Sequence, residues 1–450
     1  MRRWSSILQM WLPQNRRKDG RLPKGNESQE ASAVVPAALW QVADKPTLPT
    51  MIEIPGRQRA LLLHGTKQPY QATEDHAIPE LRGEHEVLVK THVIGLNPID
   101  WKSPDYGFGI PELPFISGRE SAGTVVKVHD AQSRFKLGDK VLVISTDYRD
   151  LRKATYQEYV VAADFNLAQI PPQLSFEQGA TLGVAFAAAV LALGICMGVD
   201  FTKALDGPDL WTLVRKVPEN ALPSDIRDEC LHGINEDERP VAGDWIAVWG
   251  ASSTSAMLAV QLARLAGLRV ISIVDKAKHG LRLSEDPNLR PDILVDSHDP
   301  VRAVQIIRGN LPHGQLRFGL DTRGRESAEA LLEALRPDYT TKAAVLPPGT
   351  PPSTPPAETG SSAHLVGLTG LPKIARPNGV VYHNVPIKLF HEVPEVGGKL
   401  VVWLERLLAE GALVPPRIVD VQDGLHTVND GLDRMRKGEI RGGKLVVKVN

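Results

Sequence analysis

Cysteine is scarce in this chain of 450 residues, which contains only Cys196 and Cys230. Two cysteines exclude a disulfide framework and any zinc lobe built from four cysteines. Excess charge is also lacking, because 52 basic and 53 acidic side chains leave a formal net charge of −1 at pH 7. This balance argues against nucleic acid as the main partner. A reducing, intracellular setting fits, and the length is sufficient for two domains with a large core.

Charged residues are absent from one long apolar run, which extends from Gly179 to Val199. Its length would allow a membrane span, but it is rich in alanine and glycine and has few large side chains. We therefore predict a buried helix and no membrane partner.

Most glycines of the usual G-x-G-x-x-G nucleotide-binding fingerprint are also missing. In the stretch GASSTS (250–255), only Gly250 stands at an expected position. The surroundings nevertheless predict the first half of a βαβ unit, with an apolar strand (245–249), a turn of small residues and a helix ended by Gly267. Such a turn places backbone N–H groups at a helix N-terminus, where an anion such as a pyrophosphate is favoured. The predicted cofactor residues of this turn are Gly250, Ala251, Ser252, Ser253 and Thr254.

Further strands at 269–274, 293–296 and 317–321 alternate with helical patterns, which predicts a parallel, doubly wound sheet. Asp275 ends the second strand, where a carboxylate commonly binds the adenosine ribose and favours NADH. Lys278 lies in a basic turn that follows and could bind the 2′-phosphate of NADPH. We predict Asp275 and Lys278 as cofactor contacts and NADPH as the cofactor, with NADH as the alternative.

Closely spaced short strands with Gly-Asp turns fill the region from Arg59 to 161 and predict a small barrel-like domain. Its segments occur in the order GLNPIDWK (95–102), ISGRESAGTVV (116–126), LGDKVLV (137–143) and YQEYVV (156–161), and GGKLVVKV (442–449) ends the chain. This order, together with the nucleotide-binding half, resembles the medium-chain dehydrogenase/reductase superfamily. Within it, the chain is most similar to the fungal zinc-free branch, which includes trans-acting enoyl reductases of polyketide pathways and quinone-reductase-like proteins.

The resemblance implies an α/β fold in which a GroES-like β-barrel catalytic domain is combined with a Rossmann doubly wound parallel-sheet nucleotide-binding domain. The expected organisation is a disordered basic tail (1–52), a GroES-like domain (53–187) completed by about 412–450, and a Rossmann domain (188–411) with an insertion (202–241) and a Pro-rich loop (339–362). The tail is interpreted as a mitochondrial targeting segment. The alternative is an artefactual extension from a mispredicted start of translation, because Met51 directly precedes the first ordered pattern. We expect a cytoplasmic protein, with a mitochondrial location as the alternative.

Zinc-dependent members of the superfamily carry a catalytic cysteine where this chain has LNP (96–98), and Gly-His-Glu where it has GRE (118–120). No metal is expected, because a catalytic zinc site needs cysteine or histidine ligands that are missing here. Glu120 is interpreted as structural, tying Arg119 or a backbone amide. In the insertion, Cys230 and His232 are too few for a metal site.

The resemblance places Asn97 and Lys102 just beyond a barrel strand, where the superfamily lines its cleft, and we predict both as catalytic residues. Lys102 could donate a proton or stabilise an enolate oxygen. The alternatives are a surface lysine on a short helix and an asparagine that only shapes the turn. Gly367 and Leu368 are expected beside the nicotinamide, and Lys444 is expected among the cofactor contacts.

The chain is thus expected to be a zinc-independent, NAD(P)H-dependent enoyl reductase that reduces an α,β-unsaturated carbonyl by hydride transfer. Two alternatives stay open, a quinone oxidoreductase-like enzyme and a nucleotide-binding pseudo-enzyme that acts as a partner protein. The expected substrate is a small molecule or an acyl chain carried by a polyketide synthase, and the protein is a monomer or a homodimer.

Overall fold

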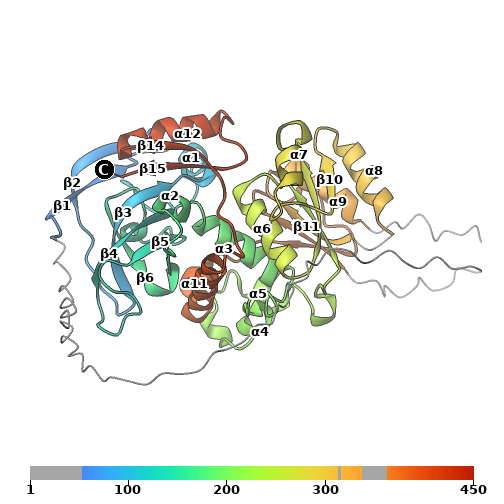
Figure 1. The fold of residues 1–450 in the computed structure, drawn as a ribbon, viewed down its shortest axis with the longest axis horizontal. Helices are drawn as coiled ribbons and strands as arrows, with labels where there is room; N and C mark the ends of the chain where they lie inside the picture. Colours follow the sequence, from blue (N-terminus) through green and yellow to red (C-terminus); the bar gives the residue numbers. More distant parts are fainter. Residues whose placement is uncertain (1–52, 313–315, 337–361, 450) are drawn as a thin grey trace, which may run out of the picture. The chain divides into compact units, whose positions relative to one another are not determined.

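The computed structural model describes residues 53–312, 316–336 and 362–449 (Figure 1). The predicted tail and nearly all of the predicted Pro-rich loop lie outside the described residues. The strands are β1 (Arg57–Leu62), β2 (Gln71–Ala77), β3 (Glu86–Gly95), β4 (Glu120–Val128), β5 (Lys140–Ile144), β6 (Tyr159–Ala163), β7 (Leu167–Gln169), β8 (Trp245–Trp249), β9 (Arg269–Val274), β10 (Ile293–Asp296), β11 (Leu316–Asp321), β12 (Ala363–Gly367), β13 (Val380–His383), β14 (Ile418–Asp423) and β15 (Lys444–Lys448). The α-helices are α1 (Pro98–Tyr106), α2 (Phe176–Gly179), α3 (Gly183–Leu191), α4 (Leu210–Val214), α5 (Arg227–His232), α6 (Thr254–Leu265), α7 (Lys276–Glu285), α8 (Pro300–Asn310), α9 (Arg325–Leu335), α10 (Lys388–Glu392), α11 (Pro394–Ala409) and α12 (Val428–Arg436).

The larger mixed sheet has the strand order β14-β15-β3-β4-β5-β7, with β6 also paired to β3. The last strand of the chain returns to this sheet, because β15 runs antiparallel to β3 and Val446 lies opposite Gly95. A separate hairpin is formed by β1 and β2. The sequence pattern did not predict β2, because QATEDHA (71–77) is polar and none of its residues is buried.

The second sheet has the order β10-β9-β8-β11-β12-β13, and all of its strand pairs are parallel. One face packs against α3 and α6 through residues such as Val248 and Leu320. The other face packs against α8 and α9 through residues such as Ala247 and Ile271. Cover on both faces explains why the strands are nearly all apolar. The predicted α/β fold with a doubly wound parallel sheet is confirmed.

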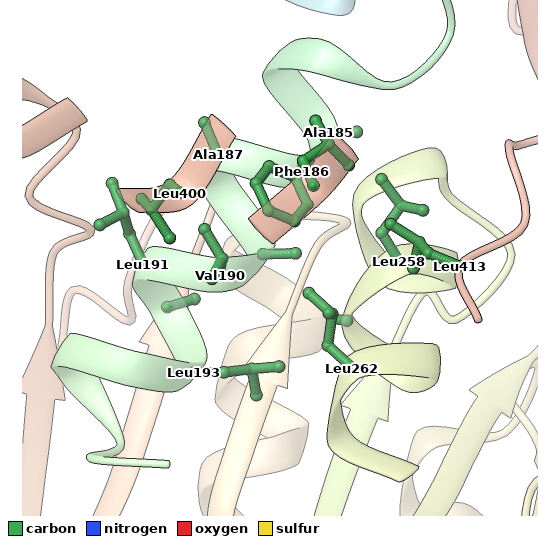
Figure 2. Close-up of a cluster of buried hydrophobic side chains, with 14 of the residues drawn as sticks. Ala185, Phe186, Ala187, Val190, Leu191, Leu193, Leu258, Leu262, Leu400 and Leu413 are labelled. Atoms are coloured by element: carbon green, nitrogen blue, oxygen red, sulfur yellow. The ribbon is translucent and has the colours of Figure 1, made fainter. Parts of the chain in front are cut away.

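The long apolar run forms a helix, with α3 continued by a π-helical turn, η3 (Ala192–Cys196). The stretch 176–196 is long and apolar enough to cross a membrane, but 89% of its most apolar window is buried inside the fold. Figure 2 shows side chains of this run, including Phe186 and Leu193, beside Leu258 and Leu262 of α6. Small alanines on α3 let the two helices approach closely, which accounts for the alanine-rich composition.

Candidate active site

The turn between β8 and α6 is built around one glycine and one serine. Gly250 has a φ of +77°, and a Cβ atom there would lie 2.7 Å from Thr322 Oγ1. Ser253 is the N-cap of α6, and its Oγ accepts a hydrogen bond from Ala256 N at 3.2 Å and donates one to Thr322 Oγ1 at 2.9 Å. The turn is therefore closed against the end of β11, and only glycine fits at its first position.

This turn lies at the point where the strand order of the parallel sheet reverses, between β8 and β11. Ligands of such sheets bind at the carboxyl ends of the strands at this point. The first turn of α6 leaves backbone N–H groups without partners in the helix, and Ser253 satisfies only that of Ala256. A dinucleotide pyrophosphate fits this arrangement, and the predicted residues Gly250 to Thr254 would hold it.

The two residues predicted to select the cofactor interact with each other. Asp275 caps α7, since its Oδ1 accepts a hydrogen bond from Lys278 N at 3.2 Å. Its Oδ2 lies 2.6 Å from Lys278 Nζ and 3.5 Å from His298 Nε2. Hydrogen bonds from Lys278 lower the pKa of Asp275. Asp275 therefore has a structural role in addition to the predicted contact with the ribose.

The end of β12 lies beside the end of β11, because Leu368 N donates to Asp321 O at 2.9 Å. A Cβ atom on Gly367 would lie 2.8 Å from Gly370 O, so the loop after β12 also requires glycine. Asp321 is fully buried, burial raises its pKa, and its Oδ2 has no hydrogen-bond partner among the described residues. The sequence analysis did not single out Asp321, although it ends a predicted strand at the crevice.

Asn97, Glu120 and Lys444 form one buried network, which we call the Lys444 network. Lys444 Nζ donates to Asn97 Oδ1 at 2.7 Å and contacts the Glu120 carboxylate. Glu120 also accepts hydrogen bonds from Asn97 Nδ2 at 3.0 Å and from Val184 N at 2.8 Å. The structural interpretation of Glu120 is confirmed for the backbone amide, whereas Arg119 is not among its hydrogen-bond partners. Lys444 was predicted as a cofactor contact; its ammonium has these buried partners, and its contact with the cofactor stays a prediction.

The Lys444 network does not fit a zinc ion. The lysine ammonium already neutralises Glu120, and Asn97 offers an amide where zinc prefers a thiolate or an imidazole. The neighbouring residue is a cation, Arg119. We therefore derive no catalytic step through a metal here.

Replacing Lys444 by methionine should lower the free energy of unfolding by about 3 kcal/mol, because the Glu120 carboxylate would stay buried without its counter-charge. Urea unfolding followed by circular dichroism measures this loss. The matched control is the double variant Lys444→Met/Glu120→Gln, which removes both charges and should recover at least half of the loss. Equal stability of the two variants would contradict a charge-based role.

The other predicted catalytic residue, Lys102, lies on α1 and is half-exposed. Its ammonium is 5.7 Å from the centroid of the Trp101 ring. Lys102 is therefore not one of the residues that form the Lys444 network.

A second buried group of polar side chains surrounds Arg119, and we call Arg119, Asp100, Tyr70, Tyr148 and Tyr156 the Arg119 cluster. Arg119 is 1% exposed, and none of its three guanidinium nitrogens has a hydrogen-bond partner among the described residues. Its Cζ atom lies 3.8 Å from the centroid of the half-buried Tyr148 ring. Burial lowers the pKa of Arg119, and the nearby tyrosines and Asp100 oppose this shift.

Two further members of the cluster have buried polar atoms of this kind, whereas the Tyr70 hydroxyl donates to Asp100 O at 2.8 Å. The Tyr156 hydroxyl and Asp100 Oδ1 are buried without a well-oriented hydrogen-bond partner among the described residues. Burial raises the pKa of Asp100 to about 6, although Arg119 acts in the opposite direction. Burial also raises the pKa of Tyr156, so its hydroxyl stays protonated and can donate. Buried polar atoms are rarely left unpaired, so this cluster is the best candidate for binding a polar group of a substrate.

The sequence analysis missed this cluster as a unit. Its members are contributed by the segment before β2, by α1, by the turn before β4 and by two loops around β5 and β6. The replacement of histidine by Arg119 within GRE (118–120) was used to exclude zinc and not to infer a role for the arginine.

Three comparisons relate this geometry to known proteins. Residues 83–172 match the model of the alcohol dehydrogenase GroES-like domain. The trans-enoyl reductase resD of Aspergillus sclerotiorum is 27% identical over 384 residues, which cover 83% of this chain and 96% of the relative. The human quinone oxidoreductase is 29% identical over 209 residues, 46% of this chain and 49% of that protein. The structure of a quinone oxidoreductase from Coxiella burnetii superimposes with a TM-score of 0.58 at 20% identity and covers 87% of this chain and 99% of that one.

The fold, the closed turn at α6 and these similarities define a two-part α/β oxidoreductase with a nicotinamide cofactor. These findings support the medium-chain dehydrogenase/reductase superfamily, because the chain is related along most of its length to fungal trans-enoyl reductases and has the fold of the quinone oxidoreductases.

Proposed function

We propose that this protein is an NADPH-dependent enoyl reductase that works without a catalytic metal on an α,β-unsaturated carbonyl. The observation that carries the proposal is the Arg119 cluster, in which the buried guanidinium has no hydrogen-bond partner among the described residues. Similarity to fungal trans-enoyl reductases along most of the chain supports the choice of an enoyl substrate.

The bound nicotinamide would supply a hydride to the β-carbon of the substrate. The chain's own residues have to stabilise the negative charge that develops on the carbonyl oxygen. Arg119 carries a fixed positive charge in a dehydrated place, where such a charge stabilises an oxyanion more strongly than in water. The Tyr156 hydroxyl, which lies close to the Asp100 carboxyl, would turn to the substrate oxygen as a second donor. The half-buried Tyr148 covers the guanidinium, so its side chain must move when a substrate binds.

The roles predicted for Asn97 and Lys102 remain proposals. Asn97 would not touch the substrate. It would keep the neighbouring Glu120 and Lys444 side chains in position through its hydrogen bonds. Lys102 would deliver the proton to the α-carbon from its half-exposed position, because its ammonium is accessible to solvent.

The proposed function is tested by comparing reduction of an enoyl thioester with reduction of a quinone, each with NADPH. We expect turnover of the enoyl thioester and a kcat/KM for the quinone that is at least about 10-fold lower. A quinone preference would favour the quinone oxidoreductase alternative. NADPH binding without turnover of either substrate would favour the pseudo-enzyme, and both of these results would contradict the proposal.

Cofactor choice should depend on the pair formed by Asp275 and Lys278. The 2′-phosphate of NADPH would compete with Asp275 for the Lys278 ammonium, which is half-exposed. We expect Lys278→Ala to lower kcat/KM with NADPH by about 5-fold to 10-fold, because exposed charge pairs contribute about 1 kcal/mol. Asp275→Asn keeps a capping side chain, and it should raise kcat/KM with NADPH and lower it with NADH. Steady-state kinetics with both cofactors checks this, and an unchanged ratio in Lys278→Ala would show that the carboxylate governs selection.

We further propose an acyl chain carried by a polyketide synthase as the substrate, in line with the fungal relatives, and a cytoplasmic location. Turnover of an acyl chain on a carrier protein, compared with the same chain on a short thiol, tests the first part. Localisation of the full chain beside a form that starts at Met51 tests the second, because a mitochondrial signal in residues 1–50 would separate the two forms.

A further inference from the structure

A buried group of side chains of the types that bind metals lies beside the parallel sheet. None of its residues belongs to the Lys444 network or to the Arg119 cluster. Cys196 ends η3, Glu229 lies on α5 within the insertion, and His383 ends β13. One ligand atom from each of these three residues lies within 4.8 Å of the other two. Cys196 and His383 are fully buried, whereas the Glu229 side chain is 17% exposed and opens a path to solvent.

The hydrogen bonds around His383 leave one atom unsatisfied. His383 Nδ1 lies 2.7 Å from Glu229 Oε1, and His383 Nε2 lies 2.9 Å from His364 Nδ1. If His383 donates to the Glu229 carboxylate, it must accept from His364, and His364 Nε2 then carries a lone pair. That atom is buried, has no hydrogen-bond partner among the described residues, and lies 4.0 Å from Glu238 Oε1. Two acceptors then face each other without a proton between them, which is costly for buried groups.

A divalent cation between Cys196, Glu229 and His383 removes this conflict. With the cation on His383 Nδ1, His383 Nε2–H donates to His364 Nδ1, and His364 Nε2–H points to the Glu238 carboxylate. Metal-binding histidines usually donate their second ring N–H to such a partner. The two imidazoles keep the same number of protons, so binding releases one proton per metal, from the Cys196 thiol.

We propose that Cys196, Glu229 and His383 form a zinc site. One thiolate, one imidazole and one carboxylate are ligands that suit zinc, and three protein ligands leave a fourth position for water. Cys196 lies on a buried helical turn, Glu229 in the insertion and His383 on the edge strand β13. A bound ion would therefore link the insertion to the sheet. This proposal departs from the sequence-based expectation of no metal, which was argued from the catalytic position and from Cys230 with His232 as too small a set. The actual partners of the insertion come from elements far away in the sequence.

Cobalt titration of the metal-free full chain tests this site, because a thiolate ligand gives cobalt a charge-transfer absorption band. We expect one cobalt per chain with this band, loss of the band on addition of zinc, and a rise in Tm of at least about 3 °C with zinc. Cys230→Ala is the matched control, since Cys230 is also buried but lies outside the group. It should keep the band, whereas Cys196→Ala should lose both the band and the rise in Tm. Glu229→Gln should weaken zinc binding by at least about 10-fold, because loss of a partner outside the ligand set already has an effect of this size.

The chain has only two cysteines, so the wild type and Cys230→Ala decide the question even if Cys196→Ala does not fold. A wild type that binds no cobalt, or binds it without the band, overturns the proposal. In that case an additional proton shared by His364 and His383 would satisfy Glu229 and Glu238. A band that disappears in Cys230→Ala also overturns it.

Discussion

Replacing Arg119 by methionine should lower kcat/KM for an enoyl substrate between about 100-fold and 1000-fold without lowering Tm. Loss of one donor to a developing oxyanion typically has an effect of this size. Stability should not fall, because the guanidinium is 1% exposed and has no hydrogen-bond partner to lose among the described residues. A buried guanidinium without hydrogen bonds destabilises a fold, and methionine fills a similar volume without that cost. The contacts of Arg119 with the Tyr148 ring and with Asp100 should offset this gain only in part. Steady-state kinetics and thermal unfolding of the same preparation check both parts.

Two control variants sharpen this test. Arg119→Lys keeps a positive charge but loses the planar set of donors, so it should retain more activity than Arg119→Met. Tyr148→Phe keeps the ring that covers the guanidinium and removes only its hydroxyl, so it should change kcat/KM by less than about 5-fold if the ring acts as a cover. An Arg119→Met variant with lower Tm and unchanged kcat/KM would show that Arg119 is structural and would remove it from the proposed mechanism.

A candidate site could be predicted from the sequence where its residues lie close together in the chain. Gly250 and Ser253 were singled out because a strand, a turn and a helix follow one another within about 20 residues, and in the structure they form a left-handed turn and a helix cap. Asp275 was recognised for the same reason, although its cap on α7 was not. Patterns of this kind depend on nearest neighbours, which the sequence displays directly.

The Arg119 cluster and the Lys444 network depend instead on contacts between distant segments. Lys444 reaches Asn97 across 347 positions because β15 pairs with β3. Nothing in the residues around Lys444 distinguishes it from a lysine at the end of an exposed strand. The burial of Arg119 is equally a product of tertiary packing, and a composition or periodicity argument treats an arginine as a surface residue. The resemblance to a family located both regions, but only the structure shows which atoms are left without partners.

Placing a carboxylate at position 253 should weaken cofactor binding by about 1000-fold. The side chain at this position caps α6 and lies in the turn predicted to hold the pyrophosphate. Two negative charges about 4 Å apart at a partly buried site repel each other by about 4 kcal/mol, which corresponds to this factor. Ser253→Asp is the best variant, because aspartate is as good an N-cap as serine and the helix should keep its stability.

Ser253→Asn is the matched control, since asparagine has the shape and capping ability of aspartate but no charge. Titration calorimetry with NADPH should give an affinity for Ser253→Asn within about 10-fold of the wild type and a much lower one for Ser253→Asp. The difference should shrink as salt is added, because a repulsion between partly exposed charges is screened. Equal affinities of the two variants would mean that the phosphates do not approach the start of α6, and the cofactor would then have to bind elsewhere along the carboxyl ends of β8 and β11.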